Sequence, residues 1–272
     1  MSEMQNGLDG VLAERLRTTA PLLPDPEFAI ALRADLITRQ REAGEVRYAP
    51  IEAPFGRIFV AHRRGVVVSA GAARDAGAFE RNVALELGAR PVAEAALPER
   101  LERALQDHFS GRRRFREVDL SWLRPFQRRV LEKTAEIPRG EVRPYSWIAR
   151  EIGSPGATRA VGTALGHNPI PFIIPCHRVV RADGSLGEYS GGGPEVKERV
   201  LTYEGVPDEV LHAPAPVYRG SRTTHIFCYP TCRHARRIQP QNAVDFASPT
   251  KAMAAGYRPC SICRPSEAAV AV

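Results

Sequence analysis

The sequence predicts a mixed α/β protein that continues into a helical part and a small cysteine-rich part. Residues 46–73 alternate apolar and polar side chains in short stretches around an H-R-R-G turn, which is typical of adjacent β-strands. Residues 123–167 contain three short amphipathic stretches separated by glycine- and proline-containing turns, which is typical of helices. Residues 228–263 contain four of the five cysteines. We therefore expect two or three units in succession.

The length and the N-terminal residues narrow the class of protein. The chain has 272 residues, of which 43% are hydrophobic, and this suffices for one sizeable core and a smaller module. The first ten residues contain neither a basic region nor an apolar run, so we expect no signal peptide. No apolar stretch approaches the roughly 20 residues that span a bilayer. We therefore expect a cytoplasmic protein with no membrane partner, where thiols stay reduced and clustered cysteines usually bind metal or take part in catalysis.

Taken in chain order, residues 1–44 form an N-terminal extension in which residues 8–42 are expected to be helical and amphipathic. Asp25 and Pro26 suit a helix start, because a proline in the first turn gives up no intrahelical hydrogen bond. The apolar residues that follow share one face at helical spacing, namely Leu32, Leu36 and Ile37. No chemistry follows from this pattern, and core packing and docking of the extension both stay open.

Helical patterns follow the predicted strands at residues 76–87 and 97–109. A basic loop, G-R-R-R-F-R, begins at Gly111 and is more often a surface feature than a site. Residues 123–136 then indicate a helix that ends at the turn I-P-R-G.

Two short helices, at residues 145–152 and 158–167, are joined by the turn G-S-P-G, and this pattern is typical of a helix-turn-helix. The second helix is rich in small residues, and Arg159 is its only formal cation. Small residues let a backbone come close to a narrow groove, whereas long side chains would read base edges. A tightly packed core helix fits the same composition.

Cys176 is the only cysteine before residue 228, and it stands in the run P-I-P-F-I-I-P-C-H-R-V-V. We expect it at the end of a buried strand, either as a reactive thiol or as a small core hydrophobe. His177 follows directly, but adjacent residues do not face each other on a strand or a helix. A water or a sharp turn would have to bridge the pair, and Glu204 is a candidate to orient the imidazole.

The basic charge is concentrated in the last part of the chain. Residues 219–264 hold eight Lys/Arg and one acid, so their excess of 8 − 1 = 7 equals the formal net charge of the whole chain, +7. Such a segment is expected to contact phosphate. The same residues contain Cys228-x3-Cys232 and, 28 residues further on, Cys260-x2-Cys263. Four thiolates in two close pairs suit tetrahedral zinc, and a reducing compartment disfavours two disulfides.

Segments between residues 122 and 206 match a known family in order and spacing. They are F-Q-R-R-V at Phe126, I-P-R-G-E at Ile137, R-A-V-G at Arg159, N-P at Asn168, P-C-H-R-V around Cys176, Y-S-G-G at Tyr189, Lys197 and Glu204. On these residues the chain resembles the methylated-DNA–protein-cysteine methyltransferase family of DNA-repair alkyltransferases. The resemblance implies a ribonuclease-H-like α/β subdomain over residues 45–120. It also implies a winged-helix-like domain over residues 121–206, in which the second helix of the helix-turn-helix enters the minor groove.

The activity that the resemblance implies is irreversible transfer of an alkyl group from O6-alkylguanine in double-stranded DNA to Cys176, with O4-methylthymine as a further candidate substrate. The base is flipped into a pocket, and the transfer needs no cofactor. By resemblance, His177 takes the thiol proton through a water, Glu204 orients the imidazole, and Asn168 holds the turn that exposes the cysteine. A thioether is a poor leaving group, so each molecule is expected to act once.

The resemblance also implies how the flipped base is held. Tyr145 donates a hydrogen bond to the purine, Lys197 lowers the cost of charge on the departing base, and Tyr189 forms a wall of the pocket. The backbone at Val179 and Ser190 reads the exocyclic amine and the oxygen.

On the helix that faces DNA, the resemblance implies that Arg159 fills the space that the flipped base leaves, with Ala160 and Gly162 against the duplex. Glu188 departs from the family, whose members more often carry a small or neutral residue before Tyr189. A carboxylate near a phosphate would disfavour DNA binding unless it turns to solvent.

The cysteine-rich segment resembles the zinc module of Ada-type DNA-repair proteins in T-T-H-I-F-C-Y-P-T-C, N-A-V-D-F and A-G-Y-R-P-C-S-I-C-R-P. The resemblance implies one zinc ion within residues 218–272, which follow a proline-containing linker at residues 207–217. In such modules the first cysteine accepts methyl groups from phosphotriesters, so Cys228 is a candidate second acceptor. Alternatively the module only holds DNA through its arginines, namely Arg222, Arg233, Arg236, Arg237 and Arg258.

Two other classes of function stay open on the residues alone. One is a damage-sensing DNA-binding or regulatory protein without repair activity, which the retained cysteine argues against. The other is a cysteine hydrolase, which is disfavoured because a histidine directly after the cysteine is poor general-base geometry. We expect zinc as the cofactor, duplex DNA as the partner, and a monomer that associates with the nucleoid when bound to DNA.

Overall fold

The computed structural model describes residues 44–212 and 217–265. The chain divides into two compact units, residues 1–45 and 46–272. The helix expected over residues 8–42 therefore lies outside the described residues. Among the residues that are described, none of the helices has the length and apolarity that crossing a membrane requires.

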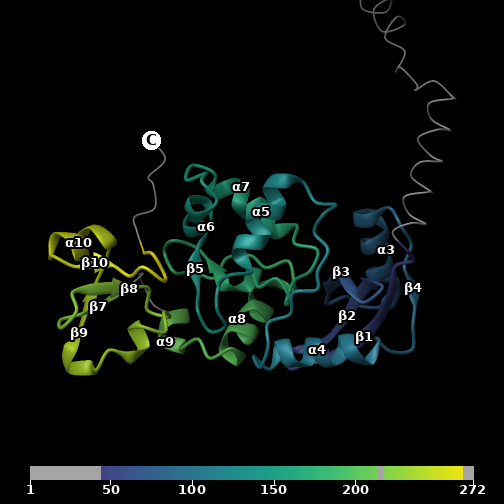
Figure 1. Ribbon diagram of the computed structural model, residues 1–272, viewed down its shortest axis with the longest axis horizontal. Coiled ribbons are helices and arrows are strands. Elements are labelled where there is room, and N and C mark those ends of the chain that lie inside the picture. Colours follow the sequence, from purple (N-terminus) through teal and green to yellow (C-terminus); the bar gives the residue numbers. More distant parts are fainter. Residues whose placement is uncertain (1–43, 213–216, 266–272) are drawn as a thin grey trace, which may run out of the picture. The chain divides into compact units, whose positions relative to one another are not determined.

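The first sheet contains four strands in the order β3-β2-β1-β4, and its β1–β4 pairing is parallel whereas the other two are antiparallel (Figure 1). The strands are β1 (Arg47–Ala53), β2 (Gly56–Arg63), β3 (Val66–Gly71) and β4 (Val92–Ala93). The β2–β3 hairpin turns at Arg64 and Gly65, whose φ angles of 52° and 85° are both positive. A two-residue type I′ turn requires two such values. The predicted strands and their H-R-R-G turn are confirmed.

Helices α3 (Ala76–Leu87) and α4 (Glu99–Phe109) cover opposite faces of this sheet, because neighbouring residues of a strand point to opposite sides. Tyr48 of β1 belongs to a buried cluster with residues of α3, whereas its neighbour Ala49 belongs to a cluster with residues of α4 (Figure 1). Asp75 caps α3 by accepting a hydrogen bond of 2.7 Å from a backbone N–H of the first turn. Both helices lie where the sequence predicts them.

Three helices form the next part, at positions that agree with the prediction to within two residues. They are α5 (Pro125–Thr134), α6 (Tyr145–Glu151) and α7 (Thr158–Gly166). Each contributes buried apolar side chains to a single core cluster. Gly153, in the turn between α6 and α7, has a φ of 73°, a conformation that only glycine adopts without strain.

A short parallel strand pair connects two distant segments of this part. Strand β5 (Arg143–Pro144) pairs with β6 (Val179–Val180), which directly follows the 3₁₀ helix η1 (Cys176–Arg178). The pairing brings the start of α6 beside the segment that carries Cys176. Helices α8 (Gly193–Tyr203) and α9 (Asp208–Leu211) follow.

The cysteine-rich part forms a second four-stranded sheet in the order β10-β8-β7-β9, which the sequence did not predict. Its elements are β7 (Tyr218–Ser221), β8 (Ile226–Cys228), η2 (Ala235–Arg237), η3 (Pro240–Asn242), β9 (Ala243–Phe246), α10 (Pro249–Ala254) and β10 (Arg258–Pro259). Gly220 of β7 permits close packing, because a Cβ there would lie 2.7 Å from the ring of Phe246 and 2.9 Å from that of Tyr257. The first of the four cysteines, Cys228, ends β8, and the third, Cys260, directly follows β10.

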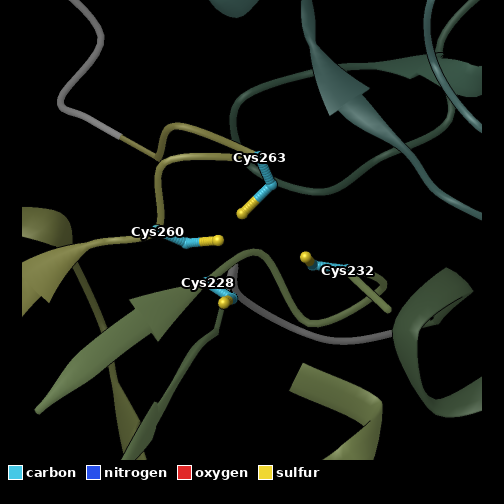
Figure 2. A group of neighbouring side chains, drawn as sticks. All are labelled: Cys228, Cys232, Cys260 and Cys263. Carbon is cyan, nitrogen blue, oxygen red and sulfur yellow. The ribbon is translucent and has the colours of Figure 1, made fainter. Parts of the chain in front are cut away.

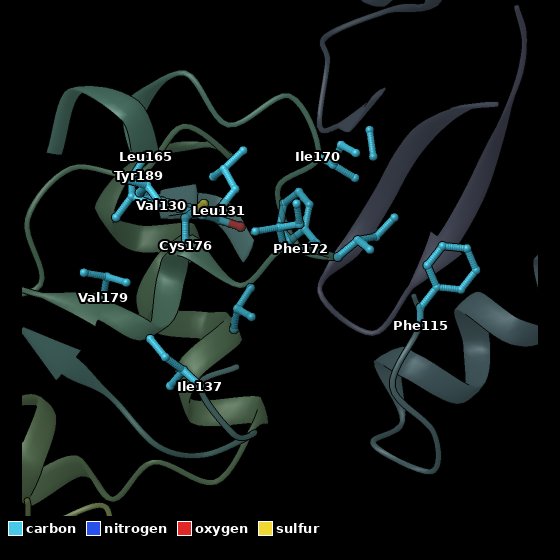
Figure 3. Close-up of a cluster of buried hydrophobic side chains, with 14 of the residues drawn as sticks. Phe115, Val130, Leu131, Ile137, Leu165, Ile170, Phe172, Cys176, Val179 and Tyr189 are labelled. Carbon is cyan, nitrogen blue, oxygen red and sulfur yellow. The ribbon is translucent and has the colours of Figure 1, made fainter. Parts of the chain in front are cut away.

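One hydrophobic cluster runs through all of these parts. It includes Ile58 of the first sheet, Leu131 of α5, Cys176 and Cys232. Figure 3 shows a portion of this cluster, in which Cys176 lies among buried apolar side chains. The thiol that the sequence singles out is therefore surrounded by the packed core.

Candidate active site and metal centre

Cys176 begins the 3₁₀ helix η1, so the expectation that it ends a buried strand is wrong. Pro175 has no N–H to extend a strand, and its ψ of 61° turns the chain away from an extended path. The Cys176 N–H then donates to the carbonyl of Ile174 over 2.8 Å. Just before this turn Phe172 has a φ of 71°, a conformation in which an aromatic residue is strained. The chain therefore makes the sharp turn that a neighbouring cysteine and histidine need.

The sulfur of Cys176 is buried, with 5% of the residue exposed, but two polar side chains contact it. The Asn168 amide donates to Sγ over 3.1 Å and also to the Ile174 carbonyl over 3.0 Å, and the Ser190 hydroxyl lies 3.9 Å from Sγ. Asn168 and Ser190 also line a cavity of about 370 Å³. Burial raises the pKa of the Cys176 thiol, and the two hydrogen bonds offset only part of this effect. The thiol is therefore protonated at rest and needs a base.

Only one ring nitrogen of His177 is held by a hydrogen bond within the described residues. Its Nε2 lies 3.1 Å from Oε1 of Glu204, whereas its Nδ1 is buried and has no hydrogen-bond partner among the described residues. Burial lowers the pKa of His177, although the carboxylate works in the opposite direction. A neutral imidazole that donates from Nε2 to the carboxylate has a lone pair at Nδ1. This nitrogen can accept a proton.

Glu204 holds Arg178 as well as His177. The Arg178 guanidinium makes two hydrogen bonds of 2.8 and 2.7 Å to the carboxylate and a third, of 2.6 Å, to the carbonyl of Ile137. Burial opposes charge on Glu204, but the facing His177 and Arg178 outweigh it and keep the pKa of Glu204 well below its usual range. Sequence reasoning missed Arg178, although an arginine inside a buried apolar run signals a charged partner.

Lys197 is completely buried on α8. Its ammonium donates to the carbonyl of Val179 over 2.6 Å and to the carbonyl of Leu186. Burial lowers the pKa of Lys197 to about 8. The Val179 N–H in turn donates to the carbonyl of Cys176. The N–H and the carbonyl of Val179 thus both form hydrogen bonds. The second lone pair of the carbonyl is left to accept a hydrogen bond from a nucleobase.

Tyr145 and Tyr189 border the reactive turn. Tyr145 opens α6 and faces α7, where a Cβ on Gly162 would lie 3.9 Å from its ring. Tyr189 packs edge-on against Phe172 and His177, at ring-centroid distances of 5.7 and 5.9 Å. Its hydroxyl is buried and has no hydrogen-bond partner in the described part of the chain. Burial raises the pKa of both phenols, so both are donors at neutral pH.

Helix α7 has one exposed face and one buried face. Arg159 and Ala160 are exposed, whereas Val161, Ala164 and Leu165 are buried against the core. The small residues therefore occupy both faces of the helix: Ala164 packs in the core, and the approach of Ala160 to a DNA groove stays a prediction. In the loop before Tyr189, the carboxylate-bearing residue Glu188 is also exposed.

The four cysteines of the last part converge on one space (Figure 2). Their sulfur atoms all lie within 4.8 Å of one another, all four residues are buried, and none forms a disulfide. Zinc–sulfur bonds of about 2.3 Å place the sulfurs of a tetrahedral site about 3.8 Å apart, which small side-chain shifts provide. Four soft thiolate donors with closed geometry suit zinc in a structural role. The predicted zinc ligands are thus brought together, namely Cys228, Cys232, Cys260 and Cys263.

The fold and these two sites define a class of protein: a mixed α/β protein with one buried thiol beside a histidine–glutamate pair and a small module in which four cysteines that suit zinc converge. The family model described as "6-O-methylguanine DNA methyltransferase, DNA binding domain" matches residues 125–206, and "Metal binding domain of Ada" matches residues 213–266. The structure of Mycobacterium tuberculosis OGT in complex with DNA is 35% identical at a TM-score of 0.51, over 61% of this chain and 98% of that chain. The protein therefore belongs to the methylated-DNA–protein-cysteine methyltransferase family.

Curated relatives named methylated-DNA–protein-cysteine methyltransferase match the helical part. The rat protein (Rattus norvegicus) is 51% identical over 83 residues, which are 30% of this chain and 40% of the relative. The protein of Mycolicibacterium paratuberculosis is 54% identical over 79 residues, 29% of this chain and 47% of the relative. The chain thus spans less than half the length of these relatives.

Proposed function

We propose that this protein repairs DNA by irreversible transfer of an alkyl group, methyl above all, from O6-alkylguanine in duplex DNA to the sulfur of Cys176. The observation that carries the proposal is a buried thiol next to an imidazole whose Nε2 is held by Glu204 and whose Nδ1 has no hydrogen-bond partner among the described residues. The similarity to a structure of Mycobacterium tuberculosis OGT in complex with DNA supports DNA as the substrate class. O4-methylthymine is a further candidate substrate.

In the proposed reaction, a water passes the thiol proton from Cys176 to Nδ1 of His177, and Glu204 stabilises the imidazolium through Nε2. The thiolate attacks the alkyl carbon, so that an S–C bond forms while the C–O6 bond breaks. The bonding electrons move onto the departing purine, which takes a proton from the phenol of Tyr145. Lys197 stabilises the negative charge that develops on the base.

Positions of the remaining predicted residues are consistent with a base pocket beside the thiol. Tyr189 packs against Phe172 and His177, and its buried hydroxyl has no hydrogen-bond partner among the described residues. Asn168 fixes the turn by donating to both Sγ and the Ile174 carbonyl. On α7, exposed Arg159 is free to enter a duplex and fill the place of the flipped base. The ribonuclease-H-like and winged-helix-like assignments, the domain bounds, the monomeric state and the cytoplasmic location stay predictions.

Intact mass spectrometry with peptide mapping tests the proposal. Incubation with a duplex that contains one O6-methylguanine should add a single methyl group to the peptide of Cys176, and Cys176→Ala protein should gain none. Repeated turnover, or transfer that persists in Cys176→Ala, would refute the mechanism. A protein that binds the duplex without a mass increase would be a damage sensor instead.

A second acceptor is favoured by the surroundings of Cys228. This cysteine lines a cavity of about 390 Å³ together with His234, Arg237 and Arg258. Cationic groups beside a thiolate suit the approach of a phosphate backbone. We infer that Cys228 accepts methyl from phosphotriesters, and methyl transfer from such a duplex to Cys228→Ser protein would rule this out.

A further inference from the structure

The zinc module contacts the alkyltransferase part through the short segment of residues 140–147. The N–H of Val142 donates to the Thr231 hydroxyl over 3.0 Å, and the N–H of Arg233 donates to the carboxylate of Glu141 over 3.0 Å. Both zinc-module residues flank the ligand Cys232. The two parts are therefore joined by hydrogen bonds in which a backbone N–H of each part donates to a side chain of the other.

Two further hydrogen bonds extend this interface. The Arg236 guanidinium donates to the carbonyl of Gly140, and the Trp147 indole donates over 3.0 Å to the carbonyl of Cys263, a zinc ligand. Thr231 and Trp147 are buried, so these contacts are shielded from water. Such buried hydrogen bonds hold the zinc module in one position relative to residues 140–147.

The same segment borders the reactive turn at both ends. At its start, the N–H of Gly140 points at the Glu204 carboxylate over 3.5 Å, and a Cβ on Gly140 would lie 2.8 Å from the Glu204 carbonyl. In its middle, Arg143 pairs with Val179 in the β5–β6 ladder. At its end, Tyr145 opens α6. A shift of this segment would therefore move Glu204 and Tyr145 relative to the thiol.

A buried ion pair lies in the middle of the interface. Arg143 is buried, forms an ion pair with the buried Glu141, and lies over the rings of Tyr229 and Trp147 at 5.2 and 5.8 Å. Glu141 thereby holds one cation of its own part and one N–H of the zinc module. A buried carboxylate shared in this way cannot move without leaving a charge unpaired.

We propose that the zinc module is a positioning element of the alkyl-transfer site: Thr231, Arg233 and Arg236 hold residues 140–145 so that Glu204 and Tyr145 stay in place for transfer to Cys176. The inference rests on the proposed function of Cys176. It assigns to the module a role in the chemistry at Cys176 that does not require the module to touch DNA or to accept an alkyl group itself.

A substrate without phosphates separates this role from DNA binding. The full-length, zinc-loaded protein reacts with free O6-methylguanine base, and the methylated Cys176 peptide is quantified over time. Arg236→Ala and Thr231→Val should lower the rate constant at saturating base by about three- to tenfold, the range that one misplaced hydrogen bond produces. The base concentration for half-maximal rate should stay unchanged for Arg236→Ala, because Glu204 does not touch the base. Arg236→Lys should recover most of the rate, since an ammonium still donates to the Gly140 carbonyl.

Matched controls come from the same module. Arg219→Ala removes an arginine whose exposed partner is Asp245, and Thr250→Val changes an exposed threonine of α10; both should react like the wild type. Zinc content and thermal melting show that each variant is folded. Equal rates for the wild type, Arg236→Ala and Thr231→Val would overturn the positioning role and leave the proposed function intact. A wild-type protein that gains no methyl group at Cys176 would overturn both.

Discussion

Glu204→Gln is the sharpest test of the reactive turn, because one carboxylate holds both the Arg178 guanidinium and the His177 imidazole. The side chains of Glu204, His177 and Arg178 are 6%, 1% and 9% exposed. Glutamine keeps the shape of the side chain but removes its charge. Arg178 then keeps only the Ile137 carbonyl as a full-strength acceptor, and His177 loses the charge that favours its protonated form.

Two magnitudes follow from this geometry. Breaking a buried ion pair costs about 3–5 kcal/mol. The lower end applies here, because the Arg178 guanidinium would still donate one hydrogen bond to the introduced glutamine and another to the Ile137 carbonyl. At about 2–4 °C per kcal/mol for a protein of this size, the midpoint of thermal unfolding should fall by about 6–12 °C. Loss of a hydrogen bond to the imidazolium removes about 1.5–3 kcal/mol from the transition state. The rate of transfer should then fall about 10- to 150-fold.

The assay is single-turnover transfer from an O6-methylguanine duplex at a temperature where both proteins are folded, followed by intact mass. Glu198→Gln is the matched control, because Glu198 lies on α8, which ends just before Glu204, and 44% of its side chain is exposed. Since the pKa of Glu204 is lowered in the folded protein, its stabilisation is present above the unfolded value of about 4.3 and is lost as pH falls further. An unchanged rate in folded Glu204→Gln protein would refute the role of His177 as an oriented base.

Three other outcomes are expected. Because burial lowers the pKa of Lys197 to about 8 while the unfolded chain keeps its proton to about 10.4, stability should rise by about 2 kcal/mol between pH 7.5 and 9.5. Chemical denaturation should show no such gain in Lys197→Met. Asn168→Ala removes a donor to Sγ, so the thiol pKa should rise, and peptide-resolved alkylation of Cys176 at pH 8 should slow several-fold; an unchanged rate would mean that the amide does not tune the thiol. Glu188→Gln should tighten duplex binding about two- to fivefold at low salt, measured by fluorescence anisotropy, if the exposed carboxylate faces DNA; equal affinity means that it points away.

Local patterns in the sequence were sufficient to predict most of the helices, strands and turns of residues 46–167. The H-R-R-G segment predicts a tight hairpin turn, and in the structure Arg64 and Gly65 both have the positive φ angles that a two-residue turn requires. The helices at residues 76–87, 145–152 and 158–167 follow from a 3.6-residue period and from the glycine- and proline-containing turns between the last two, and these signals lie within a few residues of one another. The zinc ligands are predictable for the same reason, since their spacing alone restricts the geometry.

The reactive turn is predictable only in outline. The argument that neighbouring Cys176 and His177 need a sharp turn is correct, yet the apolar run before them suggests a strand. Alternation cannot distinguish a buried strand from a buried irregular loop, because both bury every residue. The decisive contact is the Asn168 amide, which reaches forward to Ile174 and Sγ and replaces the ladder of a strand. Such a side-chain brace has no periodic signal.

The arginines of the zinc module show most clearly where sequence reasoning fails. The sequence groups Arg236 with residues that hold DNA, because clustered cations usually bind phosphate. In the structure its guanidinium donates to the carbonyl of Gly140, 96 residues earlier in the chain, whereas Arg237 lines the cavity at Cys228. Two adjacent arginines thus serve different surfaces, and only the three-dimensional path of η2 separates them. If one neighbour holds the alkyl-transfer site and the other faces phosphate, then Arg236→Ala should slow reaction with the free base, and Arg237→Ala should weaken only the binding of DNA.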